Sequence, residues 1–402
     1  MKKNMKVGVV AYRYNYYTNQ RLIVNKVPEF DYKKVYDLFS LINIPAKKIN
    51  DIASKKIFDT FNLNNIYQDF QLNQVDVIHF SNGISFGKTP WVSCFETILP
   101  RLRQLVTRHQ GGQARTVQLD SLTKRSLEAI LNPACLQIIA WSACSANMEV
   151  DLLSEFSNEY QSGIIKKMSI IHPPQDLLID DYKEKEIKTN EPIRFILVGS
   201  SFFRKGGKEI LLAFEKLKQK FNYPIQLIII SSLQIDNYAT QETQEDLAWA
   251  KAKILENQDW IIHYPGLSNQ EALTQMKSAH VGLLPSYAET YGFSALELQA
   301  SGCPVITTNI RAFPEINNEQ VGWLIDVPKN NLNEAIYTTI ESREIISNRI
   351  IAGIENIVHQ IVSDPNMVEK KGRAALEKIK HEHSPALYAS KLEAIYRRAL
   401  LS

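Results

Sequence analysis

The chain has 402 residues, enough for two compact domains at the usual one to two hundred residues per domain. Apolar residues make up 45% and charged residues 22%, with 16 glycines and 16 prolines, which excludes a collagen-like, largely disordered or coiled-coil protein. Lysine and arginine number 46 against 43 acidic residues, a formal net charge of +3, so the sequence gives no reason to expect a nucleic-acid partner.

The ends of the chain and its cysteines predict a cytoplasmic protein. Residues 1–6 run directly into a short apolar segment without a signal-peptide core, and no window reaches about 18 continuous apolar residues, as a membrane span requires. The four cysteines lie in apolar runs without C-x-x-C spacing, so we expect buried, reduced thiols. They are Cys94, Cys135, Cys144 and Cys303.

Short apolar, β-branched segments alternate with helical periodicity, which is the pattern of parallel βαβ units. In the first set, strands are expected at 7–11, 75–81, 91–95 and 136–142, with helices at 30–41 and 122–131. In the second set, strands are expected at 193–199, 225–230, 260–264, 281–285, 304–307 and 322–327. The prediction is an α/β protein with two Rossmann-like doubly wound domains facing across a cleft.

The connection between the two sets is predicted at 172–192, where prolines are followed by a charged stretch typical of an exposed linker. We therefore predict an N-terminal acceptor-binding domain at 1–185 and a C-terminal donor-binding domain at 186–379. A last helix at 386–401 has an apolar stripe of Leu387, Leu392, Ile395 and Leu400, and we expect 380–402 to pack back on the first domain.

Several motifs are absent or incomplete. No G-x-G-x-x-G occurs, which disfavours a nicotinamide dehydrogenase, and 83–89 has three residues between its glycines where a phosphate-binding loop has four. No D-x-D pair is present to hold a divalent metal. The cluster His381-Glu382-His383 lacks a third partner for a metal site and is interpreted as a solvated helix end.

The most informative segment is 285–306, which predicts a strand, a loop with glycine, a helix and a further strand. Glu289 precedes Gly292, and a helix that starts near Phe293 or Ser294 would offer backbone N–H groups to a diphosphate. Alternatively, Ser294 and Glu297 match the capping box S-x-x-E, a purely structural role. Spacing alone leaves both interpretations open.

The arrangement around these residues resembles the retaining glycosyltransferases of family 4, which have the two-domain GT-B fold. Glu289 and Glu297 reproduce the family's E-x7-E motif with Gly292 between them. The resemblance covers about 193–328 and is weaker in the first half. It also includes the segments 198–214, 263–266, 302–307, 314–315 and 322–324.

Three positions depart from the family pattern. Gly199 is followed by Ser200 where the family has arginine, and Arg204 is expected to compensate. Glu96 stands at the strand end where the family often has a catalytic histidine, and the glycine pair after the first strand is replaced by the tyrosine-rich segment 12–17. A direct catalytic part for Glu96 and an acceptor-binding or structural role are both left open.

The resemblance implies transfer of a hexose, with glucose from a UDP donor as the expected case, with retention of configuration and no metal or other cofactor. Lys205 and Arg204 would meet the diphosphate, Glu289 would hold sugar hydroxyls and Glu297 the ribose. The remaining expected donor-site residues are Gly199, Ser200, Tyr264, Pro265, Ser286, Gly292, Phe293 and Ser294. For Ser142 and Ser286, phosphate binding and helix capping are equally compatible with the sequence.

The acceptor is expected to be a glycan or lipid-linked saccharide of exopolysaccharide or cell-envelope synthesis. Candidate residues on this side are Tyr14, Tyr16, His79 and Arg101. The segment 101–125 carries six basic residues and one acid around Gly111-Gly112, and is interpreted as a mobile basic segment that attracts anionic lipid at the inner membrane face, or as a solvated loop.

Two alternatives remain beside the transferase. One is a nucleotide-sugar-binding protein without activity, suggested by the missing arginine and histidine. The other is a GT-B-fold sugar-nucleotide epimerase, which would convert the donor without any acceptor. The E-x7-E motif favours transfer.

Overall fold

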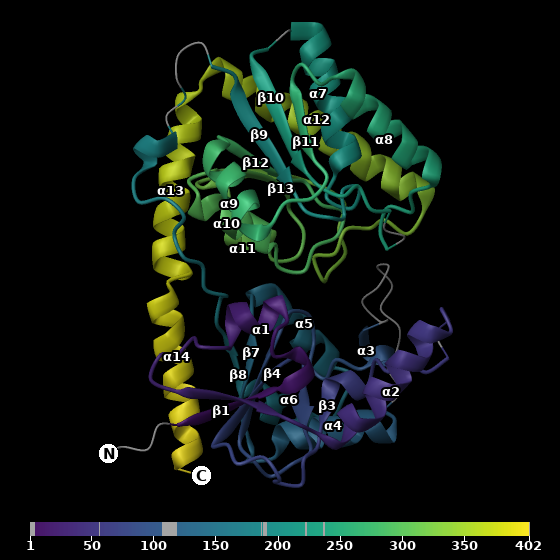
Figure 1. Cartoon of the computed structure of the whole chain (residues 1–402), viewed down its shortest axis with the longest axis vertical. Helices are drawn as coiled ribbons and strands as arrows, with labels where there is room; N and C mark the ends of the chain where they lie inside the picture. Colours follow the sequence, from purple (N-terminus) through teal and green to yellow (C-terminus); the bar gives the residue numbers. More distant parts are fainter. Residues whose placement is uncertain are drawn as a thin grey trace. The chain divides into compact units, whose positions relative to one another are not determined.

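The computed structural model describes residues 5–55, 57–106, 119–185, 187, 191–221, 223–235 and 238–401. The chain folds as two compact units (Figure 1). The first comprises Met1–Pro174 together with Pro385–Ser402, and the second comprises Gln175–Ser384. The sequence predicts the domain boundary at 185 and the return of the chain to the first domain at 380, whereas the structure divides the chain after Pro174 and after Ser384.

The first unit is built on a six-stranded parallel sheet in the order β2-β1-β4-β6-β7-β8. The four strands expected from the sequence are present. The strands are β1 (Lys6–Val10), β2 (Asp31–Val35), β4 (Val77–Ser81), β6 (Trp91–Phe95), β7 (Cys135–Ala140) and β8 (Met168–Ile170). A separate pair is formed by β3 (Ile66–Tyr67) and β5 (Ile84–Ser85).

The helix predicted at 30–41 is wrong for residues 30–37. Residues 31–35 form the edge strand β2, which pairs with β1 in parallel along its whole length, and its mostly exposed side chains give it no clear strand pattern. The helix begins only at Leu38, because the Asp37 side chain accepts a hydrogen bond from the Ser40 N–H and caps it.

The helices of the first unit include the predicted one at 122–131, which is α4. They are α1 (Tyr17–Leu22), α2 (Leu38–Ile52), α3 (Arg103–Val106), α4 (Ser121–Leu131), α5 (Ala143–Leu153), α6 (Asn158–Ile165) and α14 (Pro385–Arg397). Among the residues described, no helix is both long and apolar enough to span a membrane.

The predicted apolar stripe of the last helix is correct in part. Leu392 and Ile395 of α14 are buried, whereas Leu387 and Leu400 are exposed. Two tyrosines complete the buried face instead: Tyr388 donates a hydrogen bond to the Leu22 carbonyl (2.9 Å), and the Tyr396 hydroxyl bonds to His79 Nδ1. These contacts join α14 to the first unit.

The second unit has a six-stranded parallel sheet in the order β11-β10-β9-β12-β13-β14, and all six strands expected from the sequence are confirmed. They are β9 (Ile193–Val198), β10 (Ile225–Ile230), β11 (Ile261–Tyr264), β12 (Val281–Leu284), β13 (Val305–Thr308) and β14 (Gly322–Ile325). Its helices are α7 (Gly207–Phe221), α8 (Gln244–Glu256), α9 (Asn269–Ser278), α10 (Phe293–Ala300), α11 (Phe313–Ile316), α12 (Ile340–Ser363) and α13 (Asn366–Glu382).

Each sheet has a point where the strand order reverses. In the first sheet, the chain leaves β1 towards β2 and later returns to the other side of β1 with β4; in the second, β9 and β12 stand in the same relation. Ligands of open parallel sheets bind outside the carboxyl ends of the strands at such points. Two places are therefore singled out: one after β1 and β4, and one after β9 and β12.

The prediction of an exposed linker is wrong for part of the segment 172–192. Ile179, Tyr182 and Lys185 are buried. The Lys185 ammonium donates to the carbonyls of Met276 (2.9 Å) and Lys277 (2.8 Å), at the C-terminus of α9. A lysine there satisfies carbonyls that the helix leaves unpaired, which explains its burial in spite of the charged sequence.

Two other predictions concern cysteine and histidine. All four cysteines are buried and free, as expected. His381 is exposed, but His383 is 1% exposed at the C-cap of α13, so the interpretation of His381–His383 as a solvated cluster is wrong for this residue.

Lys185→Met is expected to lower the free energy of unfolding by about 1–3 kcal/mol, because buried carbonyls at the end of α9 lose their donor. Urea unfolding followed by circular dichroism measures the change. Lys183→Met is the matched control, because Lys183 is exposed two residues away in the chain. Equal losses in the two variants would contradict a capping role for Lys185.

Candidate functional site

In the second unit, an ion pair lies at the switch point of the sheet. The turn after β9 carries Lys205 and the loop after β12 carries Glu289, and Lys205 Nζ lies 3.1 Å from Glu289 Oε2. The two side chains are only 12% and 18% exposed. Two residues that the sequence singled out from segments 84 positions apart are thus in direct contact.

Gly199 makes room for the lysine. It has φ +142, and a Cβ atom at this position would lie 2.4 Å from Lys205 Cε. Any side chain would therefore push Lys205 away from the strand end. The turn is also tied to the loop after β12, because the Tyr287 N–H donates to the Arg204 carbonyl (2.9 Å).

Opposing effects act on the Glu289 carboxyl group. Burial raises its pKa, but the charge and hydrogen bond of Lys205, assisted by Arg204, outweigh burial, and the net pKa is lower than the ordinary value for glutamate. Glu289 is therefore a carboxylate at neutral pH, able to accept hydrogen bonds from hydroxyl groups.

The start of α10 decides between the two interpretations of Ser294 and Glu297. Gly292 is the N-cap residue, with φ +92, and no side chain caps the helix. Ser294 is therefore the second helical residue and Glu297 the fifth, so they cannot form a capping box, and that interpretation is wrong. The helix instead begins four residues after Glu289, with its N-terminus close in sequence to the ion pair.

The other expected donor-site residues lie at the same edge of the sheet. Val198 of β9 pairs with Ile230 of β10, which pairs with Tyr264 of β11, so Gly199, Ser200 and Tyr264 follow or end strands in register. Ser200 and Pro265 are exposed and Tyr264 is half-buried.

Arg204 and Ser286 are held by the protein. Arg204 Nη2 donates to Ser201 Oγ (3.0 Å), and the guanidinium lies 6.0 Å from the centre of the Tyr238 ring. Ser286 is fully buried, and its hydroxyl donates to the Leu284 carbonyl (3.5 Å) rather than capping a helix. For Ser142 the capping interpretation is correct, since it caps α5 together with Ser145.

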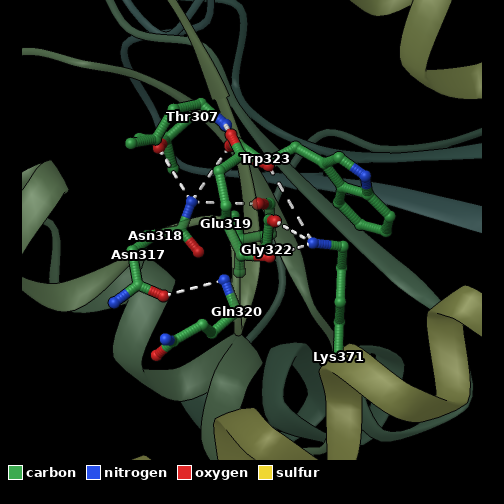
Figure 2. Close-up of polar contacts among 10 residues, drawn as sticks. Thr307, Asn317, Asn318, Glu319, Gln320, Gly322, Trp323 and Lys371 are labelled. Carbon is green, nitrogen blue, oxygen red and sulfur yellow. Dashed lines mark hydrogen bonds and ion pairs between the residues drawn. The ribbon is translucent and has the colours of Figure 1, made fainter.

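A buried asparagine that the sequence did not single out, Asn317, makes several hydrogen bonds at the ends of β13 and β14 (Figure 2). The Asn317 side-chain amide donates to the carbonyls of Val305 (3.0 Å) and Trp323 (3.1 Å) and to Thr307 Oγ1 (2.9 Å). Its oxygen accepts from Gln299 of α10 (3.3 Å). Asn317 thus joins strands β13 and β14 to the helix that carries Glu297.

Lys371 of α13 reinforces the same region in Figure 2, donating to the Gly322 carbonyl (2.9 Å) and lying 5.1 Å from the centre of the Trp323 ring. Neither Asn317 nor Lys371 belongs to a recognisable motif, so only the fold reveals that they support this part of the second sheet.

In the first unit, a cavity of about 300 Å³ lies beyond the carboxyl ends of β1, β4, β6 and β7. It occupies the other place singled out by the strand order. Its lining comes mainly from residues that end or follow those strands: Tyr12, Arg13, Tyr16, Ser81, Asn82, Glu96, Arg101 and Trp141, with Lys47 from α2.

The charged groups of this cavity are mostly basic. Arg101 Nη1 lies 2.7 Å from Glu96 Oε1, while Arg13 donates to the Ser81 carbonyl (3.1 Å) and to Asn65 Oδ1 (3.3 Å). Burial lowers the pKa of the Arg13 guanidinium, and nearby Arg101 contributes in the same direction. With Lys47, three cationic side chains and one carboxylate line the cavity among the residues that the structure describes, and this surplus of cations favours anionic ligands.

The structure brings three of the predicted first-domain residues together and leaves two apart. Glu96, Arg101 and Tyr16 line the cavity. Tyr14 is not among its lining residues, and the centre of its ring lies 5.1 Å from Lys34 Nζ. His79 is fully buried against Tyr396, and burial lowers its pKa to about 3, so it is a neutral interior residue.

In the described part of the predicted basic segment, Arg101 lines this cavity, and Arg103 and Arg125 make other contacts. Residues 107–118, with Arg108, Gly111-Gly112 and Arg115, lie outside the described residues. Arg103 forms an ion pair with Asp59 (2.5 Å), and Arg125 stacks 4.3 Å above Phe86.

Arg13 was not selected from the sequence, although its position directly after the first strand was a usable signal. Lys47 and Asn65 carry no such signal, because they reach the cavity from a helix and from a short turn.

Residues 179–355 match the model of the family described as Glycosyl transferases group 1. This segment is thus similar to the domain of glycosyl transferases group 1. It contains the Lys205–Glu289 pair and the start of α10, so the residues predicted for donor binding lie inside the matched region.

Curated relatives are distant. A D-inositol 3-phosphate glycosyltransferase of Paenarthrobacter aurescens is 26% identical over 171 residues, 40% of each chain. A glycogen synthase of Mycobacterium tuberculosis is 23% identical over 262 residues, 64% of this chain and 53% of that protein. This chain thus spans about half of these relatives or less.

Solved structures show the same fold over nearly the whole chain. Sucrose-phosphate synthase from Thermosynechococcus elongatus has a TM-score of 0.58 at 13% identity, covering 99% of this chain and 100% of that one. A glycosyltransferase from Rickettsia africae has a TM-score of 0.56 at 15% identity, covering 100% and 99%. These similarities show an α/β fold of the GT-B type with two Rossmann-like units, and the segment that matches the group 1 model lies in the second unit.

No group of three or more His, Cys, Asp or Glu side chains suited to a metal ion occurs among the residues that the structure describes. The expectation of a metal-independent reaction stays a prediction.

Asn317→Leu is expected to lower the free energy of unfolding by about 2–3 kcal/mol, because several buried polar groups lose their partner at once. Urea unfolding measures this change. The neighbouring Asn318→Ala serves as control, and should cost much less because Asn318 is partly exposed. A loss below about 0.5 kcal/mol for Asn317→Leu would contradict its role in holding α10.

Lys205→Met is expected to change the pH dependence of stability. A carboxyl group with a pKa lowered by folding stabilises the protein above its unfolded pKa of about 4.3, and this contribution is lost as the pH falls through the lower folded value. The free energy of unfolding should therefore fall less steeply between about pH 5 and pH 3 in the variant than in the wild type. Lys216→Met is the control, since Lys216 forms an exposed ion pair with Glu355. Identical slopes in wild type and Lys205→Met would show that the pair does not lower the pKa of Glu289.

Proposed function

We propose that this protein is a retaining glycosyltransferase of the family 4 type. It transfers a hexose, with glucose from UDP-glucose as the best candidate, to a glycan or lipid-linked acceptor in exopolysaccharide or cell-envelope polysaccharide synthesis. The observation that carries the proposal is the Lys205–Glu289 pair at the switch point of the group 1 domain, just before the start of α10.

The proposed donor site handles a leaving diphosphate with the protein's own cations. Lys205, Arg204 and the N-terminus of α10 meet the negative charge that grows as the glycosidic bond breaks. A charge-assisted hydrogen bond supplies about 1.5–3 kcal/mol and a helix terminus about 0.3–1 kcal/mol, against at least about 8 kcal/mol for an enzyme. Positioning of donor and acceptor must supply much of the remainder.

The ion pair suggests how the site is kept ready. Without donor, Lys205 and Glu289 satisfy each other while largely buried. With donor bound, Lys205 turns to the diphosphate and Glu289 to the sugar hydroxyls. Glu297 is placed at the ribose, and Tyr264 and Pro265 at the base, as the resemblance implies.

The proposed reaction exchanges one bond at the anomeric carbon for another. The bond from this carbon to the phosphate oxygen breaks, and a bond to the acceptor oxygen forms on the same face, which retains the configuration. The acceptor hydroxyl gives its proton to the leaving phosphate, so no carboxylate nucleophile is required. No metal ion or other cofactor takes part in this scheme.

The cavity of the first unit is the proposed acceptor site. Arg101 holds Glu96 at the end of β6, where the family often has histidine, so Glu96 is available to accept a hydrogen bond from an acceptor hydroxyl. Tyr12 and Tyr16 offer rings for sugar stacking. The surplus of basic groups favours an acceptor with a phosphate or carboxylate, such as a lipid-linked saccharide.

Donor binding tests the proposal directly. Isothermal titration with UDP-glucose, GDP-mannose and ADP-glucose in the presence of EDTA is expected to show micromolar binding of one donor. Lys205→Ala should weaken this binding by about 10- to 100-fold, because one charge-assisted hydrogen bond is lost. Glu297→Gln should weaken it as well, and Lys216→Ala, an exposed change on α7, should leave it unchanged.

Four outcomes separate the functions considered. Binding of none of the donors contradicts the donor site. Binding followed by formation of an α-glycoside, identified by NMR with a saccharide acceptor, supports transfer. Conversion of the donor without acceptor supports an epimerase, and binding without any reaction supports a noncatalytic nucleotide-sugar-binding protein.

A further inference from the structure

The helix α2 of the first unit has its apolar side turned outwards. Leu38, Leu41, Ile42, Ile49 and Ile52 are 41–77% exposed, and we call these five residues the α2 apolar face. They recur with the spacing of one helical stripe. Soluble proteins normally bury such a stripe against their core, so a contiguous exposed one indicates an interaction surface.

Hydrogen bonds fix this orientation. Ser40 and Asn43, on the opposite side of α2, are buried. Asp37 caps the helix through the Ser40 N–H (2.7 Å), and Asn43 Nδ2 donates to Asn64 Oδ1 (3.1 Å). If α2 rotated to bury its apolar face, Ser40 and Asn43 would become exposed and the hydrogen bond from Asn43 to Asn64 would break. The apolar face therefore stays exposed.

The patch continues beyond the end of the helix. Ile57 and Phe58 are about half exposed, and their N–H groups donate to Asn50 Oδ1 of α2 (2.8 and 2.9 Å). Within 38–55 the exposed charged residues are three lysines and one aspartate: Lys47, Lys48, Lys55 and Asp51. An apolar stripe bordered by lysine is the pattern of a helix that lies at the surface of an anionic membrane.

We propose that α2 docks the first unit onto an anionic lipid bilayer. Fifteen residues of helix extend about 22 Å, short of the roughly 20 residues needed to cross the hydrocarbon core, so α2 lies in the plane of the interface. A second copy of the chain is a poorer occupant, because lysine is depleted in protein–protein interfaces.

The same helix also borders the basic cavity. Lys47, half a turn from the centre of the α2 apolar face, lines it, and the Asn64 carbonyl accepts a hydrogen bond from Tyr12, another lining residue (3.2 Å). A lipid-anchored acceptor would thus meet the cavity close to the docking helix. This link rests on the proposed function, whereas the docking itself does not.

Vesicle binding tests the docking. The full chain is sedimented with vesicles of phosphatidylcholine alone and with about 30 mol% phosphatidylglycerol added. We expect binding to the anionic vesicles, reduced at least about tenfold by Leu41→Gln with Ile52→Gln and about tenfold by Lys48→Gln with Lys55→Gln. Leu255→Gln with Ile345→Gln, exposed apolar residues of α8 and α12, is the matched control and should bind like wild type.

A probe on the helix gives a second readout. All four native cysteines are buried, so an introduced Ile52→Cys can be labelled selectively with an environment-sensitive dye. Its emission should shift to the blue with anionic vesicles, while the same dye at Leu255→Cys should not respond.

Several outcomes would overturn the docking. These are a lack of vesicle binding by wild type, equal binding by the Leu41/Ile52 variant, or a dimer in light scattering that this variant converts to monomer. Titration with UDP-glucose is run on the same variants and should be unchanged, because α2 belongs to the other unit. A failure of donor binding would therefore be distinguishable from a failure of docking.

Discussion

The second unit depends on keeping two opposite charges together beneath the surface. Burial alone would raise the pKa of Glu289, and an unpaired buried lysine would be equally unfavourable. Each charge offsets the cost of burying the other, and Gly199 leaves the space in which the Lys205 side chain lies. The turn after β9 and the loop after β12 are thereby held in one geometry, at the place where a parallel sheet binds its ligand. In the proposed function, the donor replaces this mutual pairing with its own phosphate and hydroxyl groups.

The two sheets apply the same topological rule with different chemistry. After β9 and β12 the charges are balanced within an ion pair, whereas after β1 and β4 the cavity holds more cations than anions. Arg13 is the clearest sign of this difference, since burial lowers its pKa and Arg101 adds to the effect. An ion pair can bind a ligand that offers both hydrogen-bond acceptors and donors, such as a nucleotide sugar. A cavity with a surplus of positive charge favours an anionic ligand.

Buried polar side chains position the apolar elements throughout the structure. Lys185 completes the end of α9, Asn317 joins β13 and β14 to α10, and Asn43 holds α2 with its apolar face outwards. Lys185 and Asn317 each satisfy several groups that would otherwise be buried without a partner, whereas Asn43 donates to Asn64 Oδ1. The consequence differs with place: Asn317 supports the helix that carries Glu297 in the second unit, and Asn43 keeps an apolar surface of the first unit towards the solvent.

The sequence by itself determined the alternation of strands and helices, all six strands of the second sheet and the segments carrying Lys205, Glu289 and Gly292, because these features are local in period and spacing. It failed where pairing or burial is decided by distant residues. The edge strand β2 has no apolar alternation and exists because β1 lies beside it. Ser294 fits a capping box, but the helix begins two residues too early for Ser294 to be its N-cap. Lys185 and His79 are polar in sequence yet interior in the fold, and Arg13 and Lys47 meet at a cavity only because strand ends and a helix converge there. Tertiary structure decided these cases, because the environment of a charged side chain depends on what packs against it and not on its neighbours in the chain.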